Sequence, residues 1–365
     1  MNPETHDGTA VFSVVARLFS LLMGGLLLAA TVASAQSETV LYSFTGKADG
    51  ADPYSTLLLD PEGNLYGTTY EGGATCFTSL TCGTVFKVSP IGTGTVLHAF
   101  KPGVHDGYWP VSGLIRDNAG ALYGTTFNGG AGGAGVVYKI TAAGTSRLLY
   151  SFTQVADGLY PKAGLIRDAE GTFYGTTFYG GTGMACGSAG CGTVFKLTAS
   201  GTLTVLHSFS GDPDGQYPVA GLLLDATGNL YGTTAGGGGS CTSFVNGCGV
   251  VFKIAPHGTE TVLYSFTGGA DGASPGSLVM DAQGNLYGIA SSEGYVGVGC
   301  GGGCGTVFKL TPSGKQTVLH AFTGAWTEVR RWAGSSGMRR ATSMVPPNKA
   351  AARPPTSMAR ARSLK

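Results

Sequence analysis

Eight cysteines stand in four close pairs, a spacing at which thiols can form either disulfides or a metal site. Each pair precedes a recurring "TVFK"-type segment, and one of the five copies of that segment lacks both cysteines. Loss of the pair as a unit favours local disulfides over zinc, which prefers Cys-x2-Cys pairs gathered in space. We therefore predict four short-range disulfides and no metal or other cofactor: Cys76–Cys82, Cys186–Cys191, Cys241–Cys248 and Cys300–Cys304.

Two series of aspartates recur along the chain and could either bind calcium or shape turns. Members of the first precede a glycine in a linking segment, and members of the second end a short apolar run. One carboxylate per link lacks the several oxygen ligands that Ca²⁺ takes, so we predict turn residues in both places. The first series is Asp49, Asp106, Asp157, Asp214 and Asp271, and the second is Asp60, Asp117, Asp168, Asp225 and Asp281.

Catalysis needs a nucleophile, paired carboxylates or a metal set held close together. Residues that occur in only one repeat are candidates for catalysis. Three histidines do not meet this criterion, because they alternate with tyrosines at one recurring position. The residues that do occur once have no evident partner, and we predict no catalytic residue. The alternating set is His98, His207 and His320 with Tyr42, Tyr150 and Tyr264, and the single occurrences are Glu71, His105, Arg147, His257 and Glu293.

Aromatic residues precede the proline of three links, at Trp109, Tyr160 and Tyr217. The other two links carry Asp52 and Ser274 at this position. Aromatic rings exposed on one face would suit stacking against sugar rings or packing against a partner. The alternative is packing between neighbouring repeats. We predict that these three aromatic residues contribute to any ligand-binding surface.

Sequence repeats must position all of these residues. The segment "GNLYGTT" at 63–69 returns as a close variant four times, and each copy is followed by a "TVFK"-type run. A third segment, of the type "VLYSF", occurs six times, and the period is about 51–57 residues. Periods of this size are typical of propellers and arrays. The third segment ends at Phe44, Phe100, Phe152, Phe209, Phe266 and Phe322.

Each repeat carries four β-rich runs, which in the fourth copy read "GLLLD", "NLYGTT", "VVFKIA" and "TVLYSF". With 63 glycines and 12% charged residues, the composition favours short strands and tight turns. Short connections containing Gly favour antiparallel hairpins, so we predict an all-β fold, a β-propeller of four-stranded antiparallel blades. A solenoid suits shorter repeats, and separate small sheets would each bury too little.

The fourth copy, "GLLLDATGNLYGTTAGGG…CGVVFKIAPHGTETVLYSFTGGADGASP", resembles the GloVer-type tandem repeat of exported bacterial proteins, the choice-of-anchor family. The resemblance covers residues 40–324 and is specific, because several segments recur together five times. It implies export and a propeller. It supplies neither catalytic residues nor a substrate, and we expect that the family's anchoring does not carry over to this sequence.

Residues 325–365 differ from everything before them, with nine Lys/Arg and one acid. One permitted set of codons for residues 325–347 can also be read from the third base of its first codon. In that frame it encodes "VDGGSPVGGLVRDAQGNLYGTT", a faithful next copy of the repeat. Residues 358–365 likewise permit "GAGTVFK". We predict that this tail is a repeat translated out of frame, and therefore disordered rather than a nucleic-acid arm. Codon degeneracy alone could not easily produce this match, because five residues of the tail are each encoded by a single codon: Trp326, Trp332, Met338, Met344 and Met358.

The expected organisation is a signal peptide at 1–35, a propeller domain at 36–324 and the tail at 325–365. The propeller has five complete blades, and the run ending at Phe44 is a fourth strand without a blade. In a closed ring, this strand would complete a sixth blade built by the other end of the chain. Because the tail is out of frame, we predict an incompletely closed ring with exposed sheet edges.

An apolar run closed by Ala33-Ser34-Ala35 follows Arg17, as in a secretory signal peptide cleaved after Ala35. An uncleaved membrane anchor is the alternative. We predict an exported protein, extracellular, periplasmic or at the cell surface, that meets the membrane only through this peptide. Without the tail the chain has 13 basic and 20 acidic residues, which argues against a nucleic-acid partner.

Two function classes follow from these observations. The first is a binding or structural surface module, with a glycan or a cell-surface protein as its partner. The second is a propeller-type secreted hydrolase or lyase acting on a carbohydrate or lactone. Every carboxylate series is repeated and histidine is sparse, so we favour the first. Three or more unrepeated polar groups meeting in the central channel would favour the second.

Overall fold

The computed structural model describes residues 39–76, 80–183, 185–239, 241, 247–292 and 303–323. The chain divides into two compact units, Met1–Ser43 and Phe44–Lys365, and all named strands belong to the second. Within the described ranges, no helix is long and apolar enough to cross a membrane. The expected signal peptide and out-of-frame tail lie outside the described residues, as do Glu293 and Cys300.

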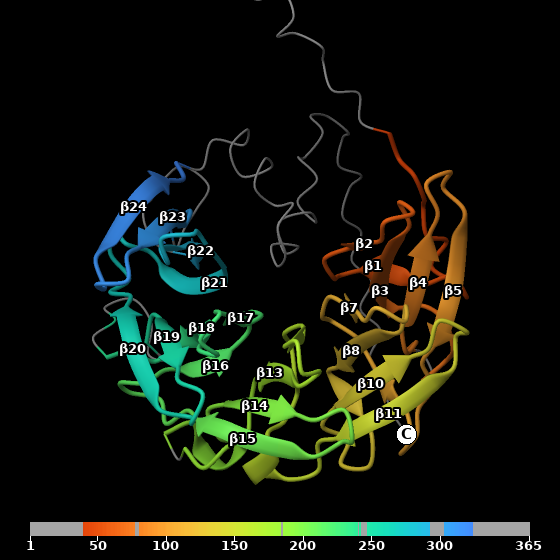
Figure 1. Cartoon of the computed structure of the whole chain (residues 1–365), viewed down its shortest axis with the longest axis horizontal. Helices are drawn as coiled ribbons and strands as arrows, with labels where there is room; N and C mark the ends of the chain where they lie inside the picture. Colours follow the sequence, from red (N-terminus) through yellow and green to blue (C-terminus); the bar gives the residue numbers. More distant parts are fainter. Residues whose placement is uncertain are drawn as a thin grey trace, which may run out of the picture. The chain divides into compact units, whose positions relative to one another are not determined.

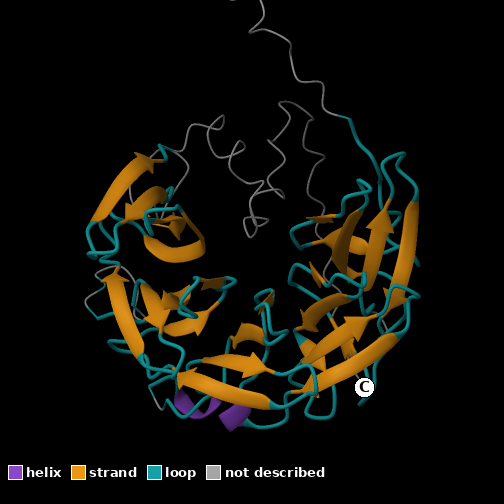
Figure 2. Cartoon of the chain, in the orientation of Figure 1, coloured by secondary structure: helices purple, strands orange, loops and turns teal. Residues whose placement is uncertain are grey.

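Short strands fill the second unit and form one antiparallel sheet for each repeat (Figures 1 and 2). The first sheet contains β1 (Ala51–Pro53), β2 (Leu58–Leu59), β3 (Leu65–Glu71), β4 (Thr84–Val88) and β5 (Gly94–Ala99). The second contains β7 (Ile115–Arg116), β8 (Leu122–Thr126), β10 (Val136–Ile140) and β11 (Ser146–Ser151), beside the paired β6 (Gly107–Tyr108) and β9 (Asn128–Gly129).

The remaining three sheets repeat this arrangement. The third contains β12 (Ile166–Arg167), β13 (Phe173–Thr177), β14 (Thr193–Leu197) and β15 (Leu203–Ser208), with the 3₁₀ turns η1 (Val155–Asp157) and η2 (Gly187–Ala189). The fourth contains β16 (Gln216–Pro218), β17 (Leu223–Leu224), β18 (Leu230–Gly236), β19 (Val250–Ile254) and β20 (Glu260–Ser265), and the fifth β21 (Ala273–Met280), β22 (Leu286–Ser292), β23 (Thr306–Leu310) and β24 (Gln316–Ala321). The strands of each sheet follow chain order, which confirms the prediction of four-stranded propeller blades.

The inner strand of blade four is interrupted, whereas that of blade five runs without a break as β21. In blade four, β16 and β17 both pair with β18, and residues 219–222 between them belong to no strand. The break follows Tyr217, whose φ of 60° is left-handed, and Pro218, which has no amide hydrogen for the ladder. The run "GLLLD" at 221–225 was predicted to be a strand, and β17 confirms it over Leu223–Leu224.

A glycine in the second strand makes room for an aromatic ring in the third. In blade three, a Cβ on Gly175 would lie 2.7 Å from the ring of Phe195 and 2.9 Å from Leu165. Phe195 is fully buried, and Gly175 pairs with it in the ladder between β13 and β14. The recurrent "LYG" is thus explained by packing, since any side chain at the glycine would displace the buried ring.

The aspartate that ends the inner strand organises the turn that follows it. Asp225 accepts hydrogen bonds from the backbone amides of Thr227 (2.8 Å) and Asn229 (2.9 Å) and from the hydroxyl of Tyr231 (3.0 Å). The same Asp–Tyr bond, 2.8–3.0 Å long, recurs in every blade, which confirms the predicted turn role. In blade one, burial acts to raise the pKa of Asp60, but bonds from Asn64 and Tyr66 outweigh it and lower the pKa to about 2.

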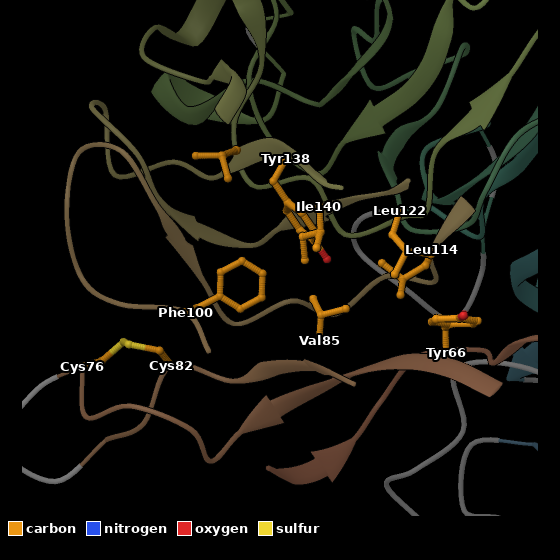
Figure 3. Close-up of a cluster of buried hydrophobic side chains, with 10 residues drawn as sticks. Tyr66, Cys76, Cys82, Val85, Phe100, Leu114, Leu122, Tyr138 and Ile140 are labelled. Carbon is orange, nitrogen blue, oxygen red and sulfur yellow. A yellow bond between two sulfur atoms is a disulfide. The ribbon is translucent and has the colours of Figure 1, made fainter. Parts of the chain in front are cut away.

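Neighbouring blades are joined by an aromatic contact that repeats along the chain. Phe100, which directly follows β5 of blade one, packs edge-on against Tyr138 of blade two with centroids 5.1 Å apart (Figure 3). Phe152–Phe195, Phe209–Phe252 and Phe266–Phe308 continue the series at 5.0–5.4 Å. Around Phe100, a buried cluster draws Val85 from blade one and Leu114 from blade two. The recurrent "SF" therefore fixes each blade to the next.

The two outermost blades each have a less well covered face. Leu57 of blade one is 53% exposed, whereas its counterparts Leu114, Leu165, Leu222 and Leu278 are at most 6% exposed. Leu319 on the other side of blade five is 52% exposed. Residues 39–45 belong to no named strand, although Phe44 packs on Phe86 as Phe100 packs on Tyr138. We call Leu57 and Leu319, with the partly exposed Val307, the end faces of the propeller.

Candidate functional site

The aspartates of the "DG" links act as turn residues. The carboxylate of Asp157 accepts a hydrogen bond from the Tyr150 hydroxyl at 2.7 Å, and that of Asp106 lies 3.1 Å from Nε2 of His98. Asp214 pairs in the same way with His207, and Asp271 with Tyr264. The His/Tyr alternation is thus explained by a shared partner. In the described part of the chain, no group of three or more His, Cys, Asp or Glu side chains could hold a metal ion.

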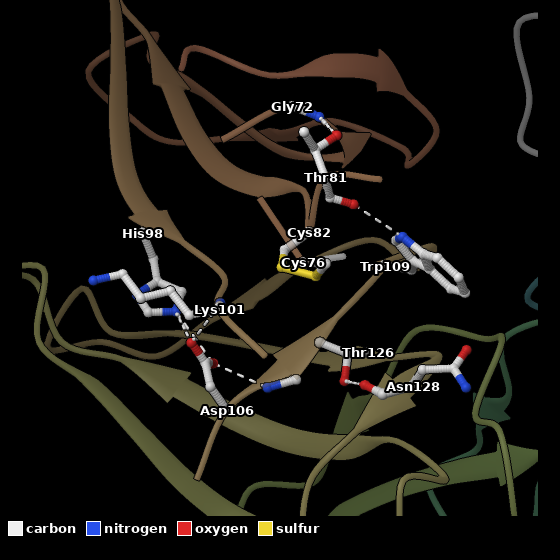
Figure 4. The surroundings of a disulfide bond; sticks show 11 residues. Gly72, Cys76, Thr81, Cys82, His98, Lys101, Asp106, Trp109, Thr126 and Asn128 are labelled. Atoms are coloured by element: carbon white, nitrogen blue, oxygen red, sulfur yellow. Dashed lines mark hydrogen bonds and ion pairs between the residues drawn. A yellow bond between two sulfur atoms is a disulfide. The ribbon is translucent and has the colours of Figure 1, made fainter. Parts of the chain in front are cut away.

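The cysteine pairs form the predicted local disulfides in three blades. Cys76–Cys82, Cys186–Cys191 and Cys241–Cys248 are bonded, with Cα atoms 5.2–5.3 Å apart. Cys304 is also disulfide-bonded, and its expected partner Cys300 lies outside the described residues. Beside the first disulfide, the carbonyl of Thr81 accepts a hydrogen bond from the indole of Trp109 at 3.0 Å (Figure 4). The loop therefore holds the next link in place.

The three predicted aromatic residues lie at the junctions between blades. Their backbone φ angles are left-handed, at 58–60°, and their amides donate to carbonyls of the preceding blade's loop at 2.8–2.9 Å. Each ring is half-buried and packs on an aromatic residue within or just after the second strand of that blade. The packing alternative thus describes part of the environment of each ring, and the ligand-binding role stays a prediction. The pairs are Trp109–Tyr70 (5.5 Å), Tyr160–Phe127 (5.1 Å) and Tyr217–Phe178 (5.0 Å).

A pocket of about 830 Å³ lies where the inner strands of all five blades meet. Its walls are backbone and small or apolar side chains of the inner strands, with hydroxyls from Ser55, Thr56 and Ser112. Aromatic rings of Tyr54, Tyr70 and Phe127 also line it. Tyr70 and Phe127 are the residues against which Trp109 and Tyr160 stack, so the predicted aromatics support the pocket wall from behind.

One charged side chain, Lys162, lines this pocket. Its ammonium lies 3.5 Å from the centroid of the Phe178 ring and 5.3 Å from that of Phe127. Burial lowers the pKa of Lys162. The pocket therefore combines apolar walls, ring faces, hydroxyls and one cation, a composition suited to a small ligand or one end of a larger one.

The Gloeobacter/Verrucomicrobia repeat matches residues 23–187 and 177–340 of the chain. The protein belongs to this family. The match confirms the resemblance based on the "GNLYGTT" and "TVFK" segments. No curated protein matches the sequence.

Solved structures with related folds share little sequence with this Gloeobacter/Verrucomicrobia repeat protein. A gluconolactonase from Xanthomonas campestris is 16% identical, with 76% of this chain and 78% of that chain covered and a TM-score of 0.44. A structural-genomics protein of unknown function from Bacteroides thetaiotaomicron is 13% identical, with coverages of 77% and 64% and a TM-score of 0.43. At such TM-scores, neither indicates what this protein binds or catalyses.

Sequence reasoning missed the pocket-lining residues of this repeat protein. The residue after "GTT" is Tyr70, Phe127 or Phe178 in three blades and Ala235 or Ser291 in the others. The residue after the link proline varies as well, and it is Lys162 in blade three alone. At both positions the residue type differs between repeats, and this variation could have identified them as candidate site positions. What the sequence could not show is that both line one pocket.

Glu260, at the start of β20, is a half-buried acid outside the pocket. Burial raises its pKa from 4.5 to about 7, with His207 opposing the rise and Asp214 adding to it. The stability that neutral Glu260 contributes is complete below pH 4.5 and is lost as the pH rises through about 7. Gln316 occupies the corresponding register position in blade five.

We expect Glu260→Gln to stabilise the protein at pH 8 by about 1 kcal/mol, a figure reduced for the partial exposure of the side chain. At pH 4 the variant and the wild type should unfold alike. Urea unfolding at both pH values measures the difference. A Glu260→Gln protein that is stabilised equally at pH 4 and pH 8 would contradict the assignment to Glu260 ionisation.

Proposed function

We propose that this protein is an exported binding module that takes a glycan, free or on a cell-surface protein, at its central pocket. The observation that carries the proposal is the pocket itself, with three aromatic rings, several hydroxyls and Lys162 around about 830 Å³. Aromatic faces stack on sugar rings, and hydroxyls exchange hydrogen bonds with sugar hydroxyls. Export is supported by the family and by the disulfides.

The predicted residues have a supporting role in this proposal. Trp109, Tyr160 and Tyr217 pack against the second-strand aromatics Tyr70, Phe127 and Phe178 and hold them in place. Their left-handed backbone is fixed by hydrogen bonds to the preceding blade, so the surface is rigid before a ligand arrives. A rigid surface loses little conformational entropy on binding.

The alternative function, a hydrolase or lyase acting on a carbohydrate or lactone, has less support. General acid–base or nucleophilic catalysis needs at least two positioned polar groups, one of which transfers a proton or attacks. Three unrepeated polar side chains, Tyr54, Tyr70 and Lys162, do meet in the pocket, as this alternative requires. The described lining contains no carboxylate, histidine or cysteine, so it lacks the usual general bases. Binding therefore remains the better proposal.

Replacing Tyr70 by alanine tests the proposed site. We expect the wild-type chain to bind a short oligosaccharide in isothermal titration calorimetry and Tyr70→Ala to bind it at least tenfold more weakly, because a ring face is lost. Ile91→Ala serves as control, since Ile91 is 88% exposed in the turn between β4 and β5, away from the pocket lining. Equal binding by Tyr70→Ala and the wild type would place the ligand elsewhere.

A further inference from the structure

Lys162 breaks the repeat at a place where the other blades are uncharged. The residue that follows the link proline is Tyr54 in blade one, Val111 in blade two and Val219 in blade four. All three line the pocket together with Lys162. A cation thus stands at a position where blades one, two and four supply apolar or aromatic side chains and blade five has Gly276. Since packing alone is satisfied by valine there, the lysine needs another explanation.

The partners of Lys162 within the protein are aromatic faces. Its ammonium lies over the rings of Phe127 and Phe178, and no carboxylate of the described residues pairs with it. Other lysines of the blades lie over a ring beyond the pocket lining, as Lys139 lies over Tyr123 with Asp117 4.0 Å away. Ring faces stabilise a cation but leave its hydrogen-bond donors unused. Those donors remain available to a ligand in the pocket.

We propose that Lys162 makes the central pocket a site for an acidic sugar, whose carboxylate pairs with the ammonium while its ring lies against Tyr70 or Phe127. This inference rests on the proposed glycan-binding function and specifies the ligand class. A single ammonium matches a single negative charge. A phosphate or sulfate ester would call for a denser set of donors, such as arginine or several backbone amides. The hydroxyls of Ser55 and Thr56 lie in the same lining and suit the sugar hydroxyls.

The pocket's low polarity strengthens the pairing. A half-buried ion pair is screened less by solvent and salt than an exposed one. The pKa of Lys162 is lowered by burial, and an anion beside it would favour the charged ammonium. The acidic ligand would therefore relieve an unfavourable position of the lysine, which a neutral sugar cannot do.

Trigalacturonate and its fully methyl-esterified form provide a matched test, because they share rings and linkages and differ in charge. With the full-length chain in isothermal titration calorimetry, we expect the acid to bind about tenfold more tightly than the ester. Lys162→Met, which keeps the length of the side chain, should lose this preference, and Lys162→Arg should keep most of it. Lys253→Met, which removes a lysine over Tyr231 outside the pocket lining, should behave as wild type.

The possible results separate this inference from the proposed function. If the acid and the ester bind the wild type equally, the acidic-sugar inference is wrong while glycan binding stands. If neither binds, both are wrong. The comparison of acid with ester needs no variant, so it decides the question even if Lys162→Met fails to fold.

Discussion

Restoring the reading frame after residue 324 should raise the thermal unfolding midpoint by about 10 °C. We propose that the restored repeat, beginning "VDGGSPVGGLVRDAQGNLYGTT", builds a sixth blade between the end faces. Leu57 and Leu319 are more than half exposed there, and Val307 is partly exposed, whereas the corresponding valines of the other blades are fully buried. Covering three such side chains is worth roughly 5 kcal/mol, or about 10 °C in a domain of this size.

A gene recoded from residue 325 to residue 365, compared with the gene as it stands, measures this effect by differential scanning calorimetry. A chain ending at Thr323 is the control, because it separates loss of the tail from gain of a blade. The restored chain should also protect the amides of β23 and β24 from hydrogen exchange. Equal midpoints for all three chains would show that the end faces gain nothing from the restored repeat, and the closure model would then be wrong.

The blade order could be predicted from the sequence because each blade is specified locally. Turn residues such as Asp225, the small Gly175 and the buried Phe195 recur at fixed spacing, and each acts within its own sheet or on its immediate neighbour. Local disulfides were predictable for the same reason, since both cysteines of a pair belong to one loop. The interruption of the inner strand in blade four was not, because the residue type of Tyr217 does not reveal its left-handed backbone.

The candidate site was less predictable because it belongs to no single blade. The pocket forms where inner strands from five repeats meet, and its character depends on which side chains differ there between repeats. Trp109, Tyr160 and Tyr217 were selected by that criterion, yet their rings pack against the preceding blade. Lys162 meets the criterion equally well. However, its contact with Phe178 joins two segments that lie apart in the sequence of blade three, so it could be seen only in the tertiary structure.

Asp225→Ala should lower the unfolding free energy at pH 7 by about 3 kcal/mol, the largest loss we expect from one surface-turn substitution. The carboxylate accepts five hydrogen bonds: from the amide and hydroxyl of Thr227, the amide and side chain of Asn229, and the hydroxyl of Tyr231. Alanine leaves all five donors without this acceptor. Glu170→Ala is the control, because it removes an exposed carboxylate from the corresponding turn of blade three.

The pH dependence of this loss identifies its cause. Burial acts to raise the pKa of Asp225, but the hydrogen bonds from Asn229 and Thr227 outweigh it and hold the pKa well below its usual 3.8. A group with a depressed pKa contributes stability above its unfolded value and loses it as the pH falls toward the folded one. In urea unfolding, the gap between wild type and Asp225→Ala should therefore be constant from pH 5 to 8 and narrow below about pH 4. A gap that stays the same down to pH 2 would mean that alanine disturbs the turn through its shape, and that the charge of Asp225 contributes little.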